Sequence, residues 1–102
     1  MSKINIEFTL FSAFYSPLIS TMTGGFLKEE GLDFEFTISA PGVSAITALD
    51  NGSADVIQST LSQGFNALNK GEIPSCVHFA QINEMDGFFL TGRDADPEFK
   101  WN

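Results

Sequence analysis

Side chains suited to holding a small molecule gather at three places in the 102-residue chain, after predicted strands and near predicted helix starts. A serine or threonine beside free backbone N–H groups favours a hydrogen-bond acceptor or an anion. Aromatic rings can stack on a flat ligand, and glycine lets a ligand approach the backbone. This mixture is typical of recognition rather than reaction. The residues predicted to contact a ligand are Phe14, Tyr15 and Ser16, then Gly42, Val43 and Ser44, then Ser59 and Thr60.

These three groups have different expected roles. The first would stack and hydrogen-bond, the second would offer backbone amides, and the third would hold an acceptor. Structural roles compete with each of them. Ser16 and Thr60 are typical helix caps, Phe11 and Phe14 are typical core residues, and residues 41–42 (Pro-Gly) are typical turn chemistry. A cap can also face a ligand, so both interpretations stay open.

The ionisable residues give a weak case for catalysis. Cys76 and His78 are the chain's one cysteine and one histidine, which excludes an internal disulfide and a Cys/His zinc site. His78 is predicted to lie in the middle of a strand with a structural role, and Asp55 to accept hydrogen bonds from nearby N–H groups. The chain has neither a GxxxxGK loop nor a GxGxxG motif. We therefore predict no catalytic residue, no metal and no cofactor.

Composition excludes several classes of protein. Thirteen acidic and five basic residues give a formal net charge of -8, which disfavours nucleic acid and anionic membrane as partners. Eleven phenylalanines argue against disorder, since disordered chains are poor in aromatic residues. No apolar run approaches the roughly 20 residues of a membrane span. No signal peptide is visible at the start of the sequence.

Hydrophobic patterning predicts five strands. Apolar and polar residues alternate over 4–10 and 32–38, as in strands with one buried face. Residues 54–58 are short and apolar enough for a sheet interior. Residues 76–82 and 88–91 are expected to form a fourth and a fifth strand.

Helices are expected between these strands, over residues 16–24, 43–51 and 59–70, with Phe65 and Leu68 of the third facing inward. The resulting order, βαβαβαββ, predicts an α/β fold with a mostly parallel sheet flanked by helices. Ligands of such sheets bind beyond the carboxyl ends of the strands. The residues predicted to contact a ligand all fall there.

Several motifs of the chain resemble those of one protein family. Residues 16–18 (SPL) and 25–33 (GFLKEEGLD) resemble the first helix of type II solute-binding proteins and the GxFxxEGLD stretch that follows it. Residues 48–56 (ALDNGSADV) resemble the ALxxGxAD segment, and residues 69–74 (NKGEIP) resemble the lead into strand four. The branch in question binds nitrate, sulfonates, taurine and pyrimidine precursors of thiamine.

The resemblance implies a two-lobed protein that closes on a small organic molecule and feeds the membrane subunits of an ABC importer. Residues 1–102 would be the N-terminal part of its first lobe. The family works in the periplasm or otherwise outside the cytoplasm. The two large aromatics at Phe99 and Trp101 look more like an interruption of a longer chain than a natural end.

Two alternatives to a solute-binding protein stay open. One is a cytoplasmic enzyme of thiamine-pyrimidine synthesis, or a cytoplasmic ligand sensor, on the same scaffold; the lack of a visible signal peptide agrees with either. The other is a self-associating interaction module that completes its sheet as a homodimer, because uncovered sheet edges and apolar surface favour pairing.

Overall fold

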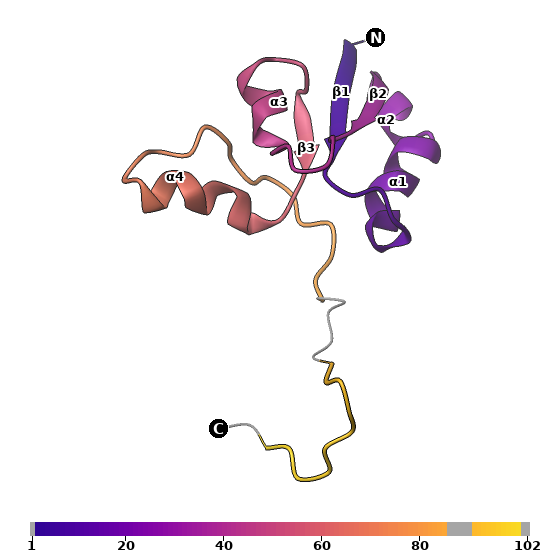
Figure 1. Cartoon of the computed structure of the whole chain (residues 1–102). Helices are drawn as coiled ribbons and strands as arrows, with labels where there is room; N and C mark the ends of the chain where they lie inside the picture. Colours follow the sequence, from indigo (N-terminus) through magenta and orange to yellow (C-terminus); the bar gives the residue numbers. More distant parts are fainter. Residues whose placement is uncertain (1, 86–90, 101–102) are drawn as a thin grey trace.

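The computed structural model describes residues 2–85 and 91–100. Strands and helices alternate along the first two thirds of the chain (Figure 1). The elements are β1 (Ser2–Phe8), η1 (Ala13–Tyr15), α1 (Ser16–Thr23), α2 (Phe26–Glu29), β2 (Leu32–Ile38), α3 (Ile46–Asp50), β3 (Val56–Gln58), η2 (Leu61–Gly64) and α4 (Phe65–Asn69).

The three strands form one parallel sheet in the order β2-β1-β3. The central strand places Ile6 opposite Phe36 on one side and opposite Val56 on the other. Parallel neighbours need long crossovers, and here α1 with α2 and then α3 provide them. The α/β fold class with a parallel sheet flanked by helices is confirmed.

A small apolar core lies between β1 and the first two helices. Its buried residues are Ile6, Phe8 and Met22, and Leu18 and Leu27 are among the half-buried side chains packed against them. The alternation in β1 turns Ile6 and Phe8 toward this core and places Glu7, which lies between them, on the other face.

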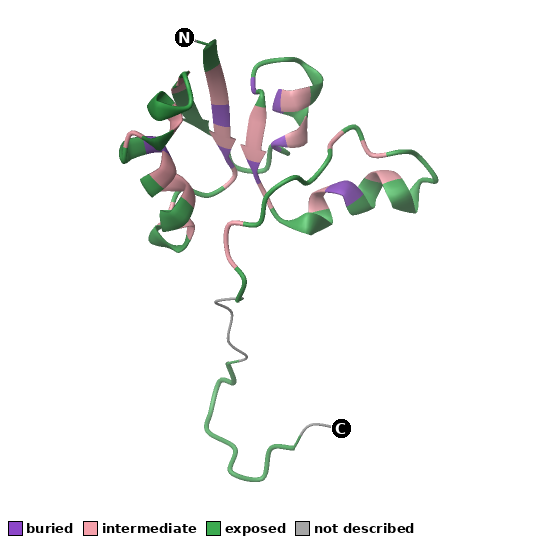
Figure 2. Cartoon of the chain, turned by 180° about the vertical axis from the view of Figure 1, so that it is seen from behind, coloured by how far each residue is buried: buried purple, intermediate pink, exposed green. Residues whose placement is uncertain are grey.

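The helix α3 lies beside β3, across the sheet from α1 and α2 (Figure 1). Ala48 of α3 is buried, as are Ala45, which precedes the helix, and Ala54, which lies ahead of β3. Figure 2 shows buried positions on the sheet, on the helices beside it and in η2, whereas the described residues beyond α4 are mainly exposed.

Two sequence expectations about the sheet are corrected. The third strand begins at Val56 rather than at residue 54. Residues 76–82 form no strand, although their composition favours one, because they do not pair with an edge of the sheet. A strand is stabilised by its neighbour, and β-propensity alone does not supply one.

The expected fifth strand, 88–91, falls largely outside the described residues, which omit 86–90. Thr91, its last residue, belongs to no strand. The expected third helix is divided into the 3₁₀ turn η2 and the short helix α4. Phe65 and Leu68 of α4 are exposed, not inward as the pattern predicted.

Candidate functional site

The loops that follow the three strands meet at one edge of the sheet, because β1, β2 and β3 are parallel. The residues between β1 and α1, between β2 and α3, and between β3 and η2 carry all eight residues predicted to contact a ligand, or lead directly into them. We call this region the carboxyl edge. The topology therefore brings together three segments that are far apart in sequence.

A buried glutamine joins the first and third of these loops. Gln58, the last residue of β3, is only 2% exposed. Its Oε1 accepts hydrogen bonds from Thr9 Oγ1 at 3.1 Å and from the Leu10 backbone N–H at 3.4 Å. Thr9 N–H also donates to the Gln58 carbonyl at 3.3 Å. Sequence reasoning missed Gln58; its signal was a polar amide at the end of an otherwise apolar strand.

A carboxylate joins the first and second loops. Glu7, near the end of the central strand, is half-buried and accepts hydrogen bonds from the hydroxyl groups of Ser39 and Thr37. The Ser39 N–H donates to the Phe8 carbonyl at 2.8 Å, which continues the β1–β2 pairing by one residue. Neither Glu7 nor Ser39 was among the predicted site residues.

The first predicted group lies in η1 and at the start of α1. The rings of Phe14 and Tyr15 meet edge to face with centroids 5.2 Å apart. Tyr15 is half-buried and packs against the core, whereas Phe14 is 42% exposed. The Phe14 carbonyl accepts a hydrogen bond from Asn83 Nδ2 at 2.8 Å, so residues near position 83 reach the carboxyl edge.

Ser16 does not cap the helix in the way its position before Pro17 suggested. Its hydroxyl donates to the carbonyl of Ala13 and so closes the turn η1. The residue at the helix-capping position is Tyr15, whose side chain makes no capping bond. A 3₁₀ turn directly ahead of α1 places a carbonyl within reach of the Ser16 hydroxyl, and that carbonyl is its partner instead of an N–H group.

Phe11 lies in an aromatic cluster at the edge instead of in the closed core. Its ring stacks on Phe36 with centroids 5.4 Å apart and planes 13° apart, and it meets the edge of Phe8 at 5.2 Å. Phe11 and Phe36 remain 43% and 45% exposed. The cluster therefore places partly exposed aromatic surface at the carboxyl edge.

The second predicted group forms a turn. Gly42 has φ of +77°, which favours glycine, and the Val43 N–H donates to the Ala40 carbonyl at 3.0 Å. Ser44 then donates its hydroxyl to Gln63 Oε1 at 3.0 Å and links this loop to η2. The turn interpretation of residues 41–42 agrees with this geometry.

The third predicted group follows β3. Thr60 stands at the capping position of η2, but its hydroxyl pairs with the Ser62 hydroxyl at 2.7 Å and makes no capping bond to the backbone. The Ser59 hydroxyl donates to the Thr60 carbonyl at 3.4 Å. The expectation that Thr60 caps a helix is therefore wrong, because a nearer hydroxyl competes for it.

Two open hollows border the described part of the chain. One, of about 310 Å³, runs between α3 and α4 and includes Ser44 and Gln63 among its lining residues. The other, of about 370 Å³, lies at the opposite end of the sheet and is lined by Met22, Lys28 and Asp33 among others. Of the eight residues predicted to contact a ligand, Ser44 alone lines one of these two hollows.

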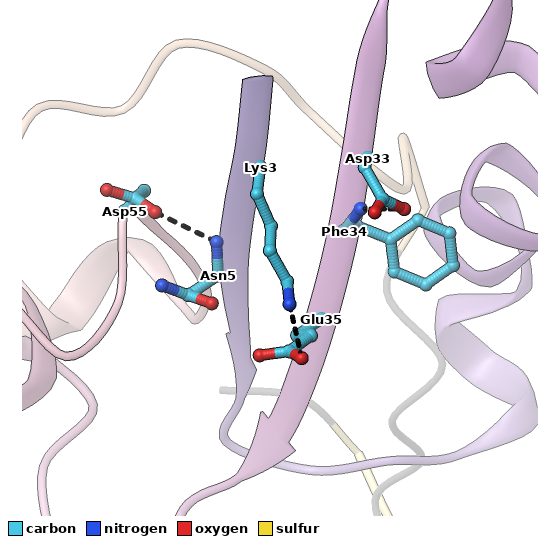
Figure 3. A network of polar contacts seen from close by, with 6 residues as sticks. All are labelled: Lys3, Asn5, Asp33, Phe34, Glu35 and Asp55. Carbon is cyan, nitrogen blue, oxygen red and sulfur yellow. Dashed lines mark hydrogen bonds and ion pairs between the residues drawn. The ribbon is translucent and has the colours of Figure 1, made fainter. Parts of the chain in front are cut away.

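Polar contacts at the amino half of the sheet are structural (Figure 3). Asp55 Oδ2 accepts from the Asn5 N–H at 2.8 Å, and the Asp55 N–H donates to the Asn5 carbonyl at 2.9 Å. The predicted structural role of Asp55 is confirmed. Lys3 donates to Glu35, and this hydrogen bond, together with the negative charges of Glu35 and Asp33, raises the pKa of Lys3 above its ordinary value.

The chain's cysteine and histidine lie outside the sheet. Cys76 is half-buried and reduced, and His78 is exposed on a segment without secondary structure, so its predicted place within a strand is wrong. Within residues 2–85 and 91–100, no three His, Cys, Asp or Glu side chains converge as ligands of a metal ion. The helices of that same part of the chain are all too short or too polar to cross a membrane.

The fold and the carboxyl edge define a parallel α/β domain whose loops converge where such domains hold ligands. No protein-family model matches the chain, and no solved structure matches it. Over all 102 residues the chain is 28% identical to a curated protein of Bacillus subtilis (strain 168) called "Putative binding protein YtlA". The chain spans 30% of that protein's length. The similarity is compatible with a ligand-binding role and does not select one branch of binding proteins.

Proposed function

We propose that the chain is the first part of the ligand-binding lobe of a two-lobed solute-binding protein. The observation that carries the proposal is the convergence of three strand-to-helix loops at the carboxyl edge, joined by the bonds of Gln58 and Ser44. The similarity of the whole chain to a binding protein supports it. The fraction of that protein matched, 30%, agrees with a lobe that continues beyond these residues.

The proposed ligand is a small organic molecule or anion of the kind bound by the resembled branch: a sulfonate, nitrate, taurine or a pyrimidine precursor of thiamine. The partly exposed rings of Phe11 and Phe36 suit an apolar or aromatic group, and the hydroxyl group of Ser44 suits a polar one. In this proposal the complete protein works outside the cytoplasm and delivers its ligand to the membrane subunits of an ABC importer.

Ligand titration of the isotopically labelled chain tests the proposal. Amide resonances of residues 12–16, 40–44 and 59–62 should shift with at least one of these four ligand types. Ser44→Ala should weaken the response, since the hydroxyl that ties residue 44 to Gln63 is lost. A matched control is Thr23→Val, which removes a hydroxyl bonded only within α1, to the Ile19 carbonyl. Shifts confined to other residues, or none with any ligand, would contradict the proposal.

A further inference from the structure

The orientation of the Gln58 side-chain amide is fixed by its neighbours. Its Oε1 accepts a hydrogen bond from the Leu10 backbone N–H at 3.4 Å. A backbone N–H can only donate, so the amide atom that faces Leu10 is the oxygen. The Thr9 hydroxyl donates to the same oxygen at 3.1 Å. The amide nitrogen, Nε2, is therefore turned away from these two groups.

The two N–H groups of Gln58 Nε2 have no acceptor among the residues that the structure describes. The residue as a whole is only 2% exposed. Within residues 2–85 and 91–100, every fully buried side-chain nitrogen or oxygen has a hydrogen-bond partner. Nε2 therefore keeps contact with solvent, and an atom the size of a water oxygen can reach it. Polar groups of buried side chains are normally paired, so this free donor points to an acceptor from outside the chain.

Gln58 lies where adjacent connections of the sheet diverge. It is paired with Phe8 across the β1–β3 ladder, and paired residues of parallel strands share a face of the sheet. From β1 the chain leads to α1, and from β3 it leads to α4 on the opposite side of the molecule (Figure 1). Ligands of parallel sheets bind beyond the strand ends at such a point. The free donor thus lies at the position that the topology favours for a ligand.

The charges around this donor suit an anionic oxygen. The three loops of the carboxyl edge fall within stretches that hold none of the thirteen acidic residues, namely 8–28, 36–49 and 56–71. Glu7 is close along β1, but it is paired with Ile57, one position before Gln58, so its side chain lies on the other face of the sheet. A hydrogen bond to a charged acceptor is roughly twice as strong as one to a neutral acceptor. An oxyanion therefore gains more from this donor than a neutral ligand does.

We propose that Gln58 Nε2 donates a hydrogen bond to an anionic oxygen of the ligand and so helps to select an oxyanion, such as a sulfonate or nitrate, at the carboxyl edge. The inference rests on the proposed function, because it assigns a contact within the same site. It adds a residue outside the eight predicted from the sequence and separates sulfonates, taurine and nitrate from the pyrimidine precursors. Gln58 then has two roles: its Oε1 holds the loop after β1, and its Nε2 meets the ligand.

NMR titration of the isotopically labelled chain with methanesulfonate, taurine, nitrate and an aminopyrimidine tests the inference on the unchanged protein. The side-chain amide resonances of Gln58 should shift with the oxyanions and stay in place with the aminopyrimidine. Shifts of the backbone amides of residues 12–16, 40–44 and 59–62 without a shift of the Gln58 side chain would overturn the inference and leave the proposed function standing. Binding of the aminopyrimidine alone would do the same.

Gln58→Glu separates the two ends of the amide. One carboxylate oxygen can still accept from Thr9 and Leu10, whereas the other replaces Nε2, donates nothing and repels an anion. The dissociation constants of methanesulfonate and nitrate should rise about tenfold or more. The matched control is Asn51→Asp, the same change between α3 and β3 at the opposite edge of the sheet, where Oδ1 accepts from the Ser53 N–H at 2.9 Å. It should leave both constants unchanged.

Circular dichroism checks that both variants keep the fold, and if Gln58→Glu unfolds, the side-chain resonances of the unchanged chain decide. A folded Gln58→Glu variant that binds the oxyanions as tightly as the unchanged chain overturns the inference alone. So does an equal weakening by Asn51→Asp, because the effect then comes from net charge. An unchanged chain that binds none of the four probes overturns the inference together with the proposed function.

Discussion

Single polar residues hold the carboxyl edge together. Gln58 Oε1 accepts hydrogen bonds from Thr9 and Leu10 in the loop after β1, and the Glu7 carboxylate accepts them from Thr37 of β2 and from Ser39 in the loop after β2. A buried hydrogen-bonding group without a partner costs more free energy than an exposed one, because water can pair with the exposed group. The positions of the site loops thus depend on residues outside the eight predicted to contact a ligand.

Gln58→Leu should lower the free energy of unfolding by about 1 kcal/mol, because the Leu10 N–H loses its acceptor, whereas the Thr9 hydroxyl keeps the Gln58 backbone carbonyl at 3.1 Å. Urea denaturation followed by circular dichroism measures the change. The control is Gln81→Leu, at an exposed position, which should stay within about 0.5 kcal/mol of the unchanged chain. Equal losses of unfolding free energy for the two substitutions would show that the hydrogen bonds of Gln58 do not stabilise the fold.

Glu35→Gln should lower the pKa of Lys3 toward its ordinary value, because the hydrogen bond from Lys3 to Glu35 is the largest cause of the rise. Asp33→Asn should lower it less, since Asp33 acts only through its charge. The raised pKa of Lys3 stabilises the fold at pH values below the unfolded-state pKa of about 10.4. This stabilisation disappears as the pH rises through the folded-state pKa. NMR titration of the Lys3 side chain measures both shifts; a larger effect of Asp33→Asn would refute the assignment.

At the scale of elements, the buried cluster of large apolar side chains joins β1 to α1 through Ile6, Phe8 and Met22. Phe8 is fully buried, and the buried apolar side chains around it are few. Small cores have little stability to lose, because the free energy of folding grows with the area that leaves water.

Phe8→Ala should therefore cost about 3–5 kcal/mol, the usual range for a buried phenylalanine, and should unfold much of the population at room temperature. Thermal and urea denaturation measure the loss. Phe79→Ala is the matched control: its ring is 76% exposed, so the change should be within about 0.5 kcal/mol. A loss as large for Phe79 as for Phe8 would mean that residues 76–82 pack against the sheet.

The elements that sequence predicted well are those whose pattern is local. Alternation gave β1 and β2, and the proline and glycines around α1 gave its limits. The strand predicted at residues 76–82 does not form, because a strand must pair with the edge of a sheet that is distant in sequence, and periodicity does not encode that pairing. The loops of the carboxyl edge followed from the parallel order of strands. The hydrogen bonds from Thr9 and Leu10 to Gln58 could not be predicted, because no spacing rule links residues that lie 49 and 48 positions apart.

The whole molecule divides into a folded sheet region and an extended remainder. Its radius of gyration is 17.3 Å and its extents are 59 × 37 × 23 Å, whereas a compact domain of this length has a radius near 13 Å. Residues 91–100 are exposed throughout, and Ile73, Val77 and Met85 are at least 82% exposed. Much of the apolar surface of this chain therefore lies outside its core.

Small-angle X-ray scattering of the chain should give a radius of gyration near the 17.3 Å of the structure, because the described residues beyond α4 add length without joining the core. A value near the roughly 13 Å of a compact domain would mean that residues 73–85 and 91–100 pack onto the sheet in solution.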